Sequence, residues 1–259
     1  KIAEDYDNSA TMGPLIHNQD EINRLKNDFN VGLYNNLSDV KDNDTVIIRT
    51  HGIPKNDLKH LRTLNAKIIN ATCPFVTTPQ QIVKKMSEEG YSILIFGDAD
   101  HPEVKGVQSY AQNQDDVHII LEPSDLENTI FKNNKIATVA QTTKKKEKYL
   151  EIVNYLILKN KEVRVFNTIC DATFENQDAA RELSKEVDIM IVIGGKNSSN
   201  TKQLHSICLE NCPDSYLIEN ENELNNSWFS NKKLCGVTAG ASTPDWIIQQ
   251  VINKIESNE

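Results

Sequence analysis

The sequence predicts an α/β fold built from three related modules with mainly parallel sheets. Apolar runs typical of strands alternate with amphipathic runs typical of helices along the 259 residues, the pattern of parallel α/β proteins. The chain also repeats itself, since residues 93–97 (ILIFG) resemble residues 190–194 (MIVIG), 97 positions later (190 − 93). Residues 139–142 resemble residues 237–240 at nearly the same interval. A shared period indicates a pseudo-threefold assembly whose polar loops meet at one centre.

The repeat divides the chain into three α/β modules at 1–72, 73–168 and 169–259, without long linkers. The first copy of the repeat is the weakest. In it, residues 13–18 correspond to the loop that carries His101, and residues 48–51 correspond to the loop that carries Thr142. Short apolar runs predict the strands. They are expected at 46–49, 67–69, 91–96, 117–121, 135–139, 163–166, 189–193, 216–218 and 234–237.

Periodic apolar positions and capping signals predict the helices. Residues 1–5 are typical of the end of an amphipathic helix. Further helices are expected at 57–64, from Thr78 to Gly90, after Glu103, and at 144–158, 175–187, 201–209 and 247–255. Thr78-Pro79 combines a hydroxyl cap with a first-turn proline, and Gly90 ends that helix. The helix at 144–158 is expected to bury Leu150, Val153 and Ile157.

Composition excludes several classes of function. A formal net charge of −9 argues against nucleic acid or an anionic membrane as the main partner. No apolar run approaches the length that spans a bilayer. Five cysteines without paired spacing indicate free thiols or metal ligands rather than a disulfide framework.

Cys73 and Cys170 each follow a predicted strand and precede a polar stretch that leads into a helix. Ligands in α/β folds bind at the carboxyl ends of strands, so both cysteines are candidate metal ligands. One module further back, the equivalent position lies before Lys1, and the repeat predicts a third cysteine there. Three thiolates suit an iron–sulfur cluster with one open iron, and they equally suit a catalytic zinc. Cys208 and Cys235 are expected in the core.

Two polar loops before helices predict an anion site. Residues 197–200 (NSSN) follow Gly194-Gly195, and residues 242–245 begin the last helix. Either stretch could serve only as a helix cap, but amides, hydroxyls and a helix N-terminus also bind phosphate groups. Together with His17 and His51, these loops favour a phosphate or diphosphate ligand.

Glu103 is the only carboxylate in the sequence His101-Pro102-Glu103 and lies at the start of a predicted helix. Spacing alone leaves two interpretations open. The residue is either a favourable acid in the first helical turn or a general acid beside a metal site.

These motifs together resemble the family of 4-hydroxy-3-methylbut-2-enyl diphosphate reductases, which act last in the non-mevalonate isoprenoid pathway. The matching stretches are 13–18 (GPLIHN), 50–52 (THG), 71–74 (ATCP), 100–106 (DHPEVKG), 141–143 (QTT), 169–173 (ICDAT), 196–200 (KNSSN) and 236–242 (GVTAGAS). The resemblance implies a trefoil of three α/β modules around an oxygen-sensitive [4Fe-4S] cluster.

The resemblance also implies roles for individual residues. Cys73 and Cys170 correspond to two of three cluster ligands, and Glu103 corresponds to the proton donor. Thr142 would hold the hydroxyl end of the substrate, and His101 would assist near the diphosphate. The implied diphosphate ligands are His17, His51, Ser198, Ser199, Asn200 and Ser242.

The implied activity is that of a bacterial, cytoplasmic oxidoreductase. It would remove the C4 hydroxyl with two electrons from a ferredoxin or flavodoxin, yielding isopentenyl and dimethylallyl diphosphates. The family's first cysteine motif is expected just before Lys1, so the 259 residues alone are expected to hold an incomplete cluster. Two alternatives remain at this point: a zinc-dependent hydrolase of a phosphorylated substrate, and a non-catalytic module that binds a phosphorylated ligand.

Overall fold

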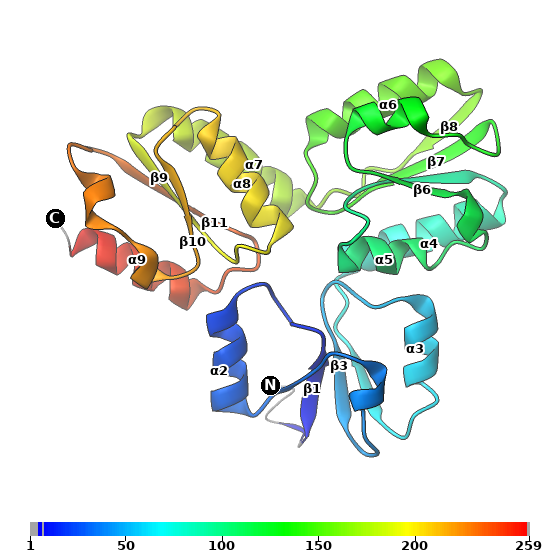
Figure 1. Ribbon diagram of the computed structural model, residues 1–259, viewed down its shortest axis with the longest axis horizontal. Helices are drawn as coiled ribbons and strands as arrows, with labels where there is room; N and C mark the ends of the chain where they lie inside the picture. The colour runs from blue at the N-terminus through cyan, green and yellow to red at the C-terminus, as the bar shows by residue number, and fades with distance from the viewer. Residues whose placement is uncertain (1–4, 7, 258–259) are drawn as a thin grey trace. The chain divides into compact units, whose positions relative to one another are not determined.

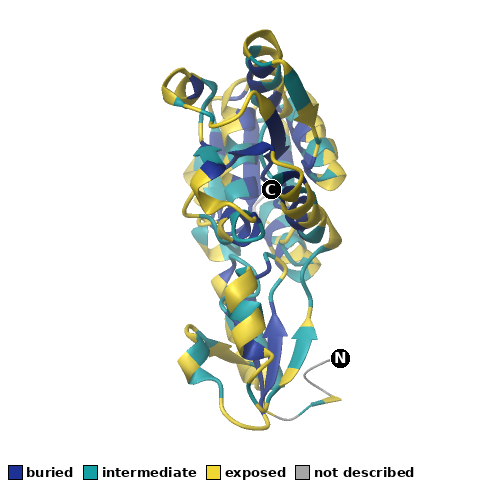
Figure 2. Cartoon of the chain, turned by 90° about the vertical axis from the view of Figure 1, so that its right-hand side faces the viewer, coloured by how far each residue is buried: buried dark blue, intermediate teal, exposed yellow. Residues whose placement is uncertain are grey.

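The structure is a computed structural model that describes residues 5–6 and 8–257. These residues form three sheets with helices on their faces (Figure 1). Central strands are buried, and the outward sides of the helices are exposed (Figure 2). The helix end expected at 1–5 falls, apart from Asp5, outside the described residues.

The first sheet has the order β2-β1-β3-β4, and every neighbouring pair is parallel. Its strands are β1 (Ser9–Met12), β2 (Gly32–Tyr34), β3 (Thr45–Ile48) and β4 (Lys67–Asn70). Met12, Val46 and Ile48 pack with Leu61 of α3 (Lys55–Leu61) in one core. Since all four strands run in the same direction, the loops that carry Arg49, His51 and Cys73 leave the same edge of this sheet.

The second sheet repeats this arrangement in the order β6-β5-β7-β8, again with parallel pairs. Its strands are β5 (Ser92–Phe96), β6 (Val117–Ile120), β7 (Lys135–Ala140) and β8 (Glu162–Val165). Helices α4 (Pro74–Glu88) and α5 (Pro102–Gln108) cover one face, and α6 (Lys146–Lys159) covers the other (Figure 1). The loops with His101, Thr142 and Cys170 follow β5, β7 and β8.

The third sheet contains β9 (Ile189–Ile193), β10 (Ser215–Ile218) and β11 (Cys235–Ala239) in the parallel order β10-β9-β11. Every side chain of β9 is buried because both faces are covered. Ile191 and its odd-numbered neighbours pack on α9 (Asp245–Glu256). Met190 packs with α7 (Asp171–Glu186) and α8 (Ser199–Leu209). The predicted α/β class with parallel sheets is confirmed.

The chain divides into two compact units. The first unit comprises Lys1–Leu15 and Lys26–Cys170, and the second comprises Ile16–Leu25 and Asp171–Glu259. The short segment of the second unit includes most of α2 (Gln19–Phe29). It is held by side-chain hydrogen bonds within that unit, from Asn18 to the Glu219 carbonyl and from Trp246 to Glu21. Each sheet lies within one of the predicted modules 1–72, 73–168 and 169–259. These boundaries between the modules stay a prediction.

The expected start of α4 at Thr78-Pro79 is wrong. The helix begins at Pro74, with Cys73 at the N-cap position, and it contains Pro79. The hydroxyl groups of Thr77 and Thr78 instead donate to the Pro74 carbonyl, each at 3.0 Å. Proline is favoured in the first turn of a helix. Of the two prolines in this stretch, Pro74 rather than Pro79 begins the helix. Helices α7 and α8 likewise begin before 175 and 201, directly after Cys170 and Ser198.

The expected buried face of α6 is also wrong. Leu150 and Ile157 are 50% and 57% exposed, whereas Tyr149, Ile152 and Leu156 are buried. Tyr149 determines this rotation. Its ring stacks on Phe96 with centroids 6.1 Å apart, and its hydroxyl group donates to the carbonyls of Thr138 and Phe166.

Short 3₁₀ turns complete the structure at Leu37–Asp39, Gln114–Asp116, Pro123–Asn128, Glu221–Glu223 and Asn226–Phe229. Among the described residues, no helix has the length and apolar composition to cross a membrane.

The orientation of α6 predicts different costs for two substitutions on the same helix. Ile152→Ala removes a fully buried side chain and should lower the free energy of unfolding by about 2–4 kcal/mol. Leu150→Ala removes a half-exposed side chain and should cost less than about 1 kcal/mol. Urea unfolding of both variants measures the difference, and equal costs would contradict the observed face.

Candidate active site

Glu103 is a buried carboxylate at the start of α5, where it follows the N-cap residue His101. It is only 2% exposed. Thr142, which follows β7, donates to both carboxylate oxygens: its backbone N–H to Oε1 and its hydroxyl to Oε2, each at 2.7 Å. This contact joins two strand-end loops that are 39 residues apart in the chain. The side chain therefore lies on Thr142, and its role as a general acid stays a prediction.

Two opposing effects act on the pKa of Glu103. Burial is the larger effect and raises the pKa above the ordinary value of 4.5, because the charged form is poorly solvated. The hydrogen bonds from Thr142 and the positive charge of Lys144 lower it again. The protonated carboxyl group therefore persists to higher pH than in an exposed glutamate, which is the property of a general acid.

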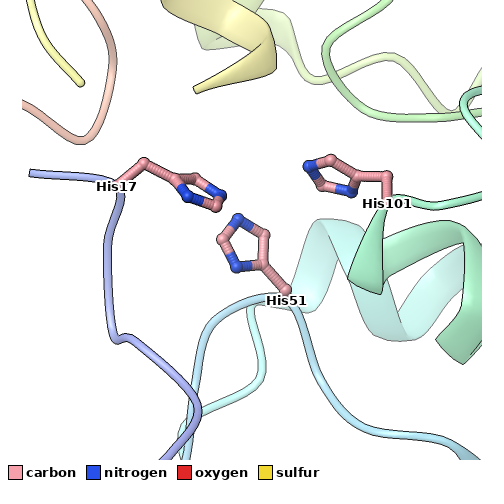
Figure 3. A group of neighbouring side chains, drawn as sticks. All are labelled: His17, His51 and His101. Carbon is pink, nitrogen blue, oxygen red and sulfur yellow. The ribbon is translucent and has the colours of Figure 1, made fainter. Parts of the chain in front are cut away.

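His101 and His51 lie close together in the first unit (Figure 3). Their rings are edge to face, with centroids 5.3 Å apart and an angle of 88° between planes. The Nδ1 atom of His101 accepts a hydrogen bond from the Glu103 backbone N–H at 3.2 Å. In the neutral ring this contact assigns the proton to Nε2. The polar loops of the first two predicted modules thus meet at these two histidines.

Gln141 fixes the loop between β5 and α5. Its Oε1 atom accepts from the Asp98 backbone N–H at 3.0 Å, and its Nε2 atom donates to the Thr143 hydroxyl at 3.2 Å. Gly97 is required at this point, because a Cβ atom there would lie 2.7 Å from Val104. The loop that presents His101 is therefore positioned by Gln141, which follows β7, and by Val104 of α5.

Cys73 and Cys170 occupy equivalent positions after the outer strands β4 and β8. Both are free thiols of intermediate exposure. The backbone N–H of Cys73 donates to the Thr50 carbonyl at 3.0 Å, and that of Cys170 donates to the Thr142 carbonyl at 2.9 Å. Each cysteine is thus tied to the neighbouring strand-end loop and directly precedes a helix.

The two cysteines fit an iron–sulfur group. Thiolates ligate such clusters, and a helix N-terminus stabilises negative charge nearby. Both thiols are partly accessible, and both backbones are fixed by hydrogen bonds. Cys208 and Cys212 are buried, and burial raises the pKa of Cys208 and Cys235 to about 11. All three thiols belong to the core of the second unit, as the sequence predicts for Cys208 and Cys235.

The second unit contains the loop 194–200 before α8. Ser198 caps this helix, and its hydroxyl accepts from the Thr201 backbone N–H at 3.3 Å. Asn200 is 6% exposed, and among the described residues neither its amide oxygen nor its amide nitrogen has a hydrogen-bond partner. A buried amide without partners is costly in a protein interior, so it marks a position that a polar ligand can satisfy. Ser199 is half-buried, and Ser242 is exposed.

Gly195 allows the loop 194–200 to contact the backbone of His17 within the second unit. A Cβ atom on Gly195 would lie 1.4 Å from the His17 carbonyl oxygen, so no other residue fits without a backbone shift. Gly194 has φ +150° and would clash with the hydroxyls of Thr201 and Thr243 if it carried a side chain. These contacts place the backbone of His17 directly against Gly195.

Several residues of this region are not predicted by the sequence. Thr168 is buried, and its hydroxyl group bonds both the N–H and the carbonyl of Ala140, at 2.8 and 2.6 Å. Trp246 donates to Glu21 at 3.0 Å. These contacts join distant segments, and no local pattern in the sequence indicates them.

Comparison with known proteins gives the family. The model of the family described as "LytB protein" matches residues 1–256. A 4-hydroxy-3-methylbut-2-enyl diphosphate reductase of Nitratiruptor sp. is 63% identical over 256 residues, covering 99% of this chain and 92% of that protein. Reductases of the same name from Sulfurovum sp. (63%) and Campylobacter concisus (60%) are aligned over 99% of this chain and 92% of their own lengths.

Two solved structures are similar. One is titled the structure of (E)-4-hydroxy-3-methyl-but-2-enyl diphosphate reductase, the terminal enzyme of the non-mevalonate pathway. It is 42% identical, with a TM-score of 0.71 over 99% of this chain and 90% of that one. The other is the Plasmodium falciparum E-1-hydroxy-2-methyl-but-2-enyl-4-diphosphate reductase, 26% identical, with a TM-score of 0.90 over 97% and 79%. From the family match over residues 1–256 and these identities, this chain belongs to the LytB protein family.

Proposed function

We propose that this chain catalyses the reductive removal of the C4 hydroxyl from (E)-4-hydroxy-3-methylbut-2-enyl diphosphate. The reaction takes up two electrons and two protons, breaks the C4–O bond, and releases water with isopentenyl or dimethylallyl diphosphate. The names of the relatives support this activity. The observation that carries it is the buried Glu103 carboxyl group, which is held by Thr142 beside the Cys170 backbone.

An iron–sulfur group is implied by the family. We propose a [4Fe-4S] cluster with Cys73 and Cys170 among its ligands, since both are free, partly accessible and fixed at strand ends. When bound, the cluster supplies electrons and a Lewis-acidic iron. A ferredoxin or flavodoxin is the proposed electron donor.

Glu103 is the proposed proton source for the leaving hydroxyl group. Its carboxyl group is protected from water, its pKa is raised by burial, and Thr142 fixes its orientation. The Thr142 hydroxyl lies 2.7 Å from Oε2 of Glu103 and has acceptor lone pairs. When Glu103 is protonated, its O–H can donate to the Thr142 oxygen while the Thr142 hydroxyl turns to donate to the substrate oxygen. This contact supports a proton relay from Glu103 through Thr142 to the leaving group.

The diphosphate group is assigned to neutral hydrogen-bond donors. In the first unit, His51 and His101 present two rings side by side. In the second unit, the proposed ligands are His17, Ser198, Ser199, Asn200 and Ser242. The unsatisfied amide of Asn200 supports this role most directly. Such donors suit an acidic chain that offers no lysine cluster in these motifs.

The zinc-dependent hydrolase and the non-catalytic binding module are not favoured. Close relatives over nearly the full chain are named as reductases. A binding module would also give no role to a buried acid whose carboxyl group is held by Thr142.

Glu103→Gln should lower kcat by about 10²-fold or more, because the amide keeps the shape but cannot donate the proton. The substrate Kd should change less than threefold. Anaerobic reductase assays of the holoenzyme measure kcat, and calorimetry measures binding. The exposed Glu127→Gln is the matched control and should keep full activity. An active Glu103→Gln enzyme would remove Glu103 from the proton path.

Thr142→Val should move the alkaline limb of the pH–rate profile to higher pH. The lost hydroxyl group stabilises the charged carboxylate, so removing it raises the pKa of Glu103 further and keeps the acid protonated at higher pH. Thr142→Ser retains the hydroxyl group and should leave the limb in place. A limb that stays fixed in Thr142→Val would show that another group titrates.

Cys73→Ser and Cys170→Ser should each lower the iron and sulfide content of the anaerobically purified protein. The hydroxyl group of serine is a poorer ligand for iron–sulfur clusters than a thiolate. Cys235→Ser changes a core thiol of the second unit and should retain the wild-type iron content. Equal iron in all three variants would contradict the assignment of the two ligands.

A further inference from the structure

A cavity of about 570 Å³ lies in the first unit, on the carboxyl side of β1 and β3. Its walls include apolar side chains from Met12, Ile53 and Pro54. Polar groups enter it from Arg49, Lys105 and the segment 35–38. Gly52 and Pro102 also line it, so the cavity adjoins the loops of His51 and His101 without containing either histidine. None of the roles proposed above uses this cavity.

Arg49 is the unusual residue of this cavity. Its guanidinium lies against Gly13, where a Cβ atom would approach Cζ and Nη1 to 2.8 Å. Gly13 has φ +74°, so both its backbone conformation and its lack of a side chain make room for the guanidinium. Nη1 donates to the Pro14 carbonyl at 3.5 Å, which is a long contact. The Nε atom is buried, and no described residue accepts its hydrogen bond.

A buried N–H without an acceptor is expensive on a charged side chain, even where the rest of the side chain is only half-buried. Arginine stays charged even though burial lowers its pKa, so its hydrogen-bonding needs cannot be removed by deprotonation. The guanidinium fork matches the geometry of a carboxylate or phosphate group. An oxyanion that entered the cavity would supply the missing acceptor.

The carboxylates around the cavity do not supply this acceptor. Asp100 is 97% exposed and forms an ion pair with Lys105 at 3.2 Å. Asp57 is partly exposed at the N-terminal turn of α3, where the helix dipole stabilises its charge. Both carboxylates are accessible to solvent, whereas Nε of Arg49 is shielded from it. The buried N–H of Arg49 therefore favours an anionic ligand in the cavity.

We propose that this cavity binds a small organic oxyanion, with the anionic group on Arg49 and the apolar body against Met12 and Ile53. The ligand class is a carboxylate or phosphate monoester that carries a short apolar chain. This site is separate from the proposed diphosphate ligands and does not depend on the reductase activity.

Isothermal titration of the anaerobic holoenzyme with n-butyl phosphate and with inorganic phosphate tests the site. n-Butyl phosphate should bind about tenfold more tightly, the gain expected from burying two methylene groups. Sodium butyrate is a third probe and distinguishes carboxylate from phosphate ligands by its relative affinity. Equal affinity for n-butyl phosphate and inorganic phosphate would overturn the proposed apolar half of the site.

Arg49→Gln should weaken n-butyl phosphate binding at least tenfold, and Arg49→Lys should weaken it less. The exposed Arg62→Gln makes the same charge change in the same unit and should have no effect. Lys105→Gln removes a charge at the rim of the cavity and leaves the loop that carries Arg49 undisturbed. It should weaken n-butyl phosphate binding two- to fivefold.

His51→Asn separates this site from the diphosphate site. It should impair reductase activity but leave n-butyl phosphate binding within twofold of wild type. Binding that is lost in His51→Asn and retained in both Arg49→Gln and Lys105→Gln would overturn the proposal, even if the reductase assignment holds.

Discussion

The pairing of the buried Glu103 carboxyl group with Thr142 is the interaction on which the proposed chemistry depends. Two donors at 2.7 Å hold a group that is almost completely removed from water. Burial favours the protonated acid, while the hydrogen bonds favour the carboxylate. The proposed acid therefore retains its proton to higher pH than an exposed glutamate does.

This pairing exists because parallel strands bring their following loops to one edge of a sheet. Within the second sheet, β5 carries the loop of His101 and Glu103, and β7 carries Thr142. The next strand, β8, leads to Cys170, whose N–H bonds the Thr142 carbonyl. One edge of the sheet therefore brings together the proposed acid, its hydroxyl partner and the proposed cluster ligand Cys170.

Much of this arrangement follows from local patterns in the sequence. The all-apolar run of β9 and the position of Cys170 after an apolar run predicted their strands correctly, because period and composition carry that information. The face of α6 was not predictable in this way. Residues 149, 152 and 156 have the same helical spacing as 150, 153 and 157, and the contact of Tyr149 with Phe96 decides between them.

Contacts between distant residues account for the remainder. The contact of Glu103 with Thr142 joins two loops that are 39 residues apart in the chain. Segment 16–25 belongs to the second unit, where Trp246 donates to Glu21. Gly195 is likewise required because the backbone of His17 lies close to it. No residue next to Gly195 in the sequence indicates this contact. Local patterns in the sequence identify most of the residues that make these contacts. They do not indicate which distant residues contact one another.

Difference infrared spectroscopy of wild type against Glu103→Gln tests the central claim most directly. The account predicts the carbonyl stretching band of a protonated buried carboxylic acid in wild type, absent from Glu103→Gln. The band should persist at pH values where exposed glutamates are fully ionised, and it should shift in Thr142→Val because the Thr142 hydroxyl bonds the carboxyl group. A wild-type spectrum with only a carboxylate band that titrates near the ordinary pKa of 4.5 would contradict the account.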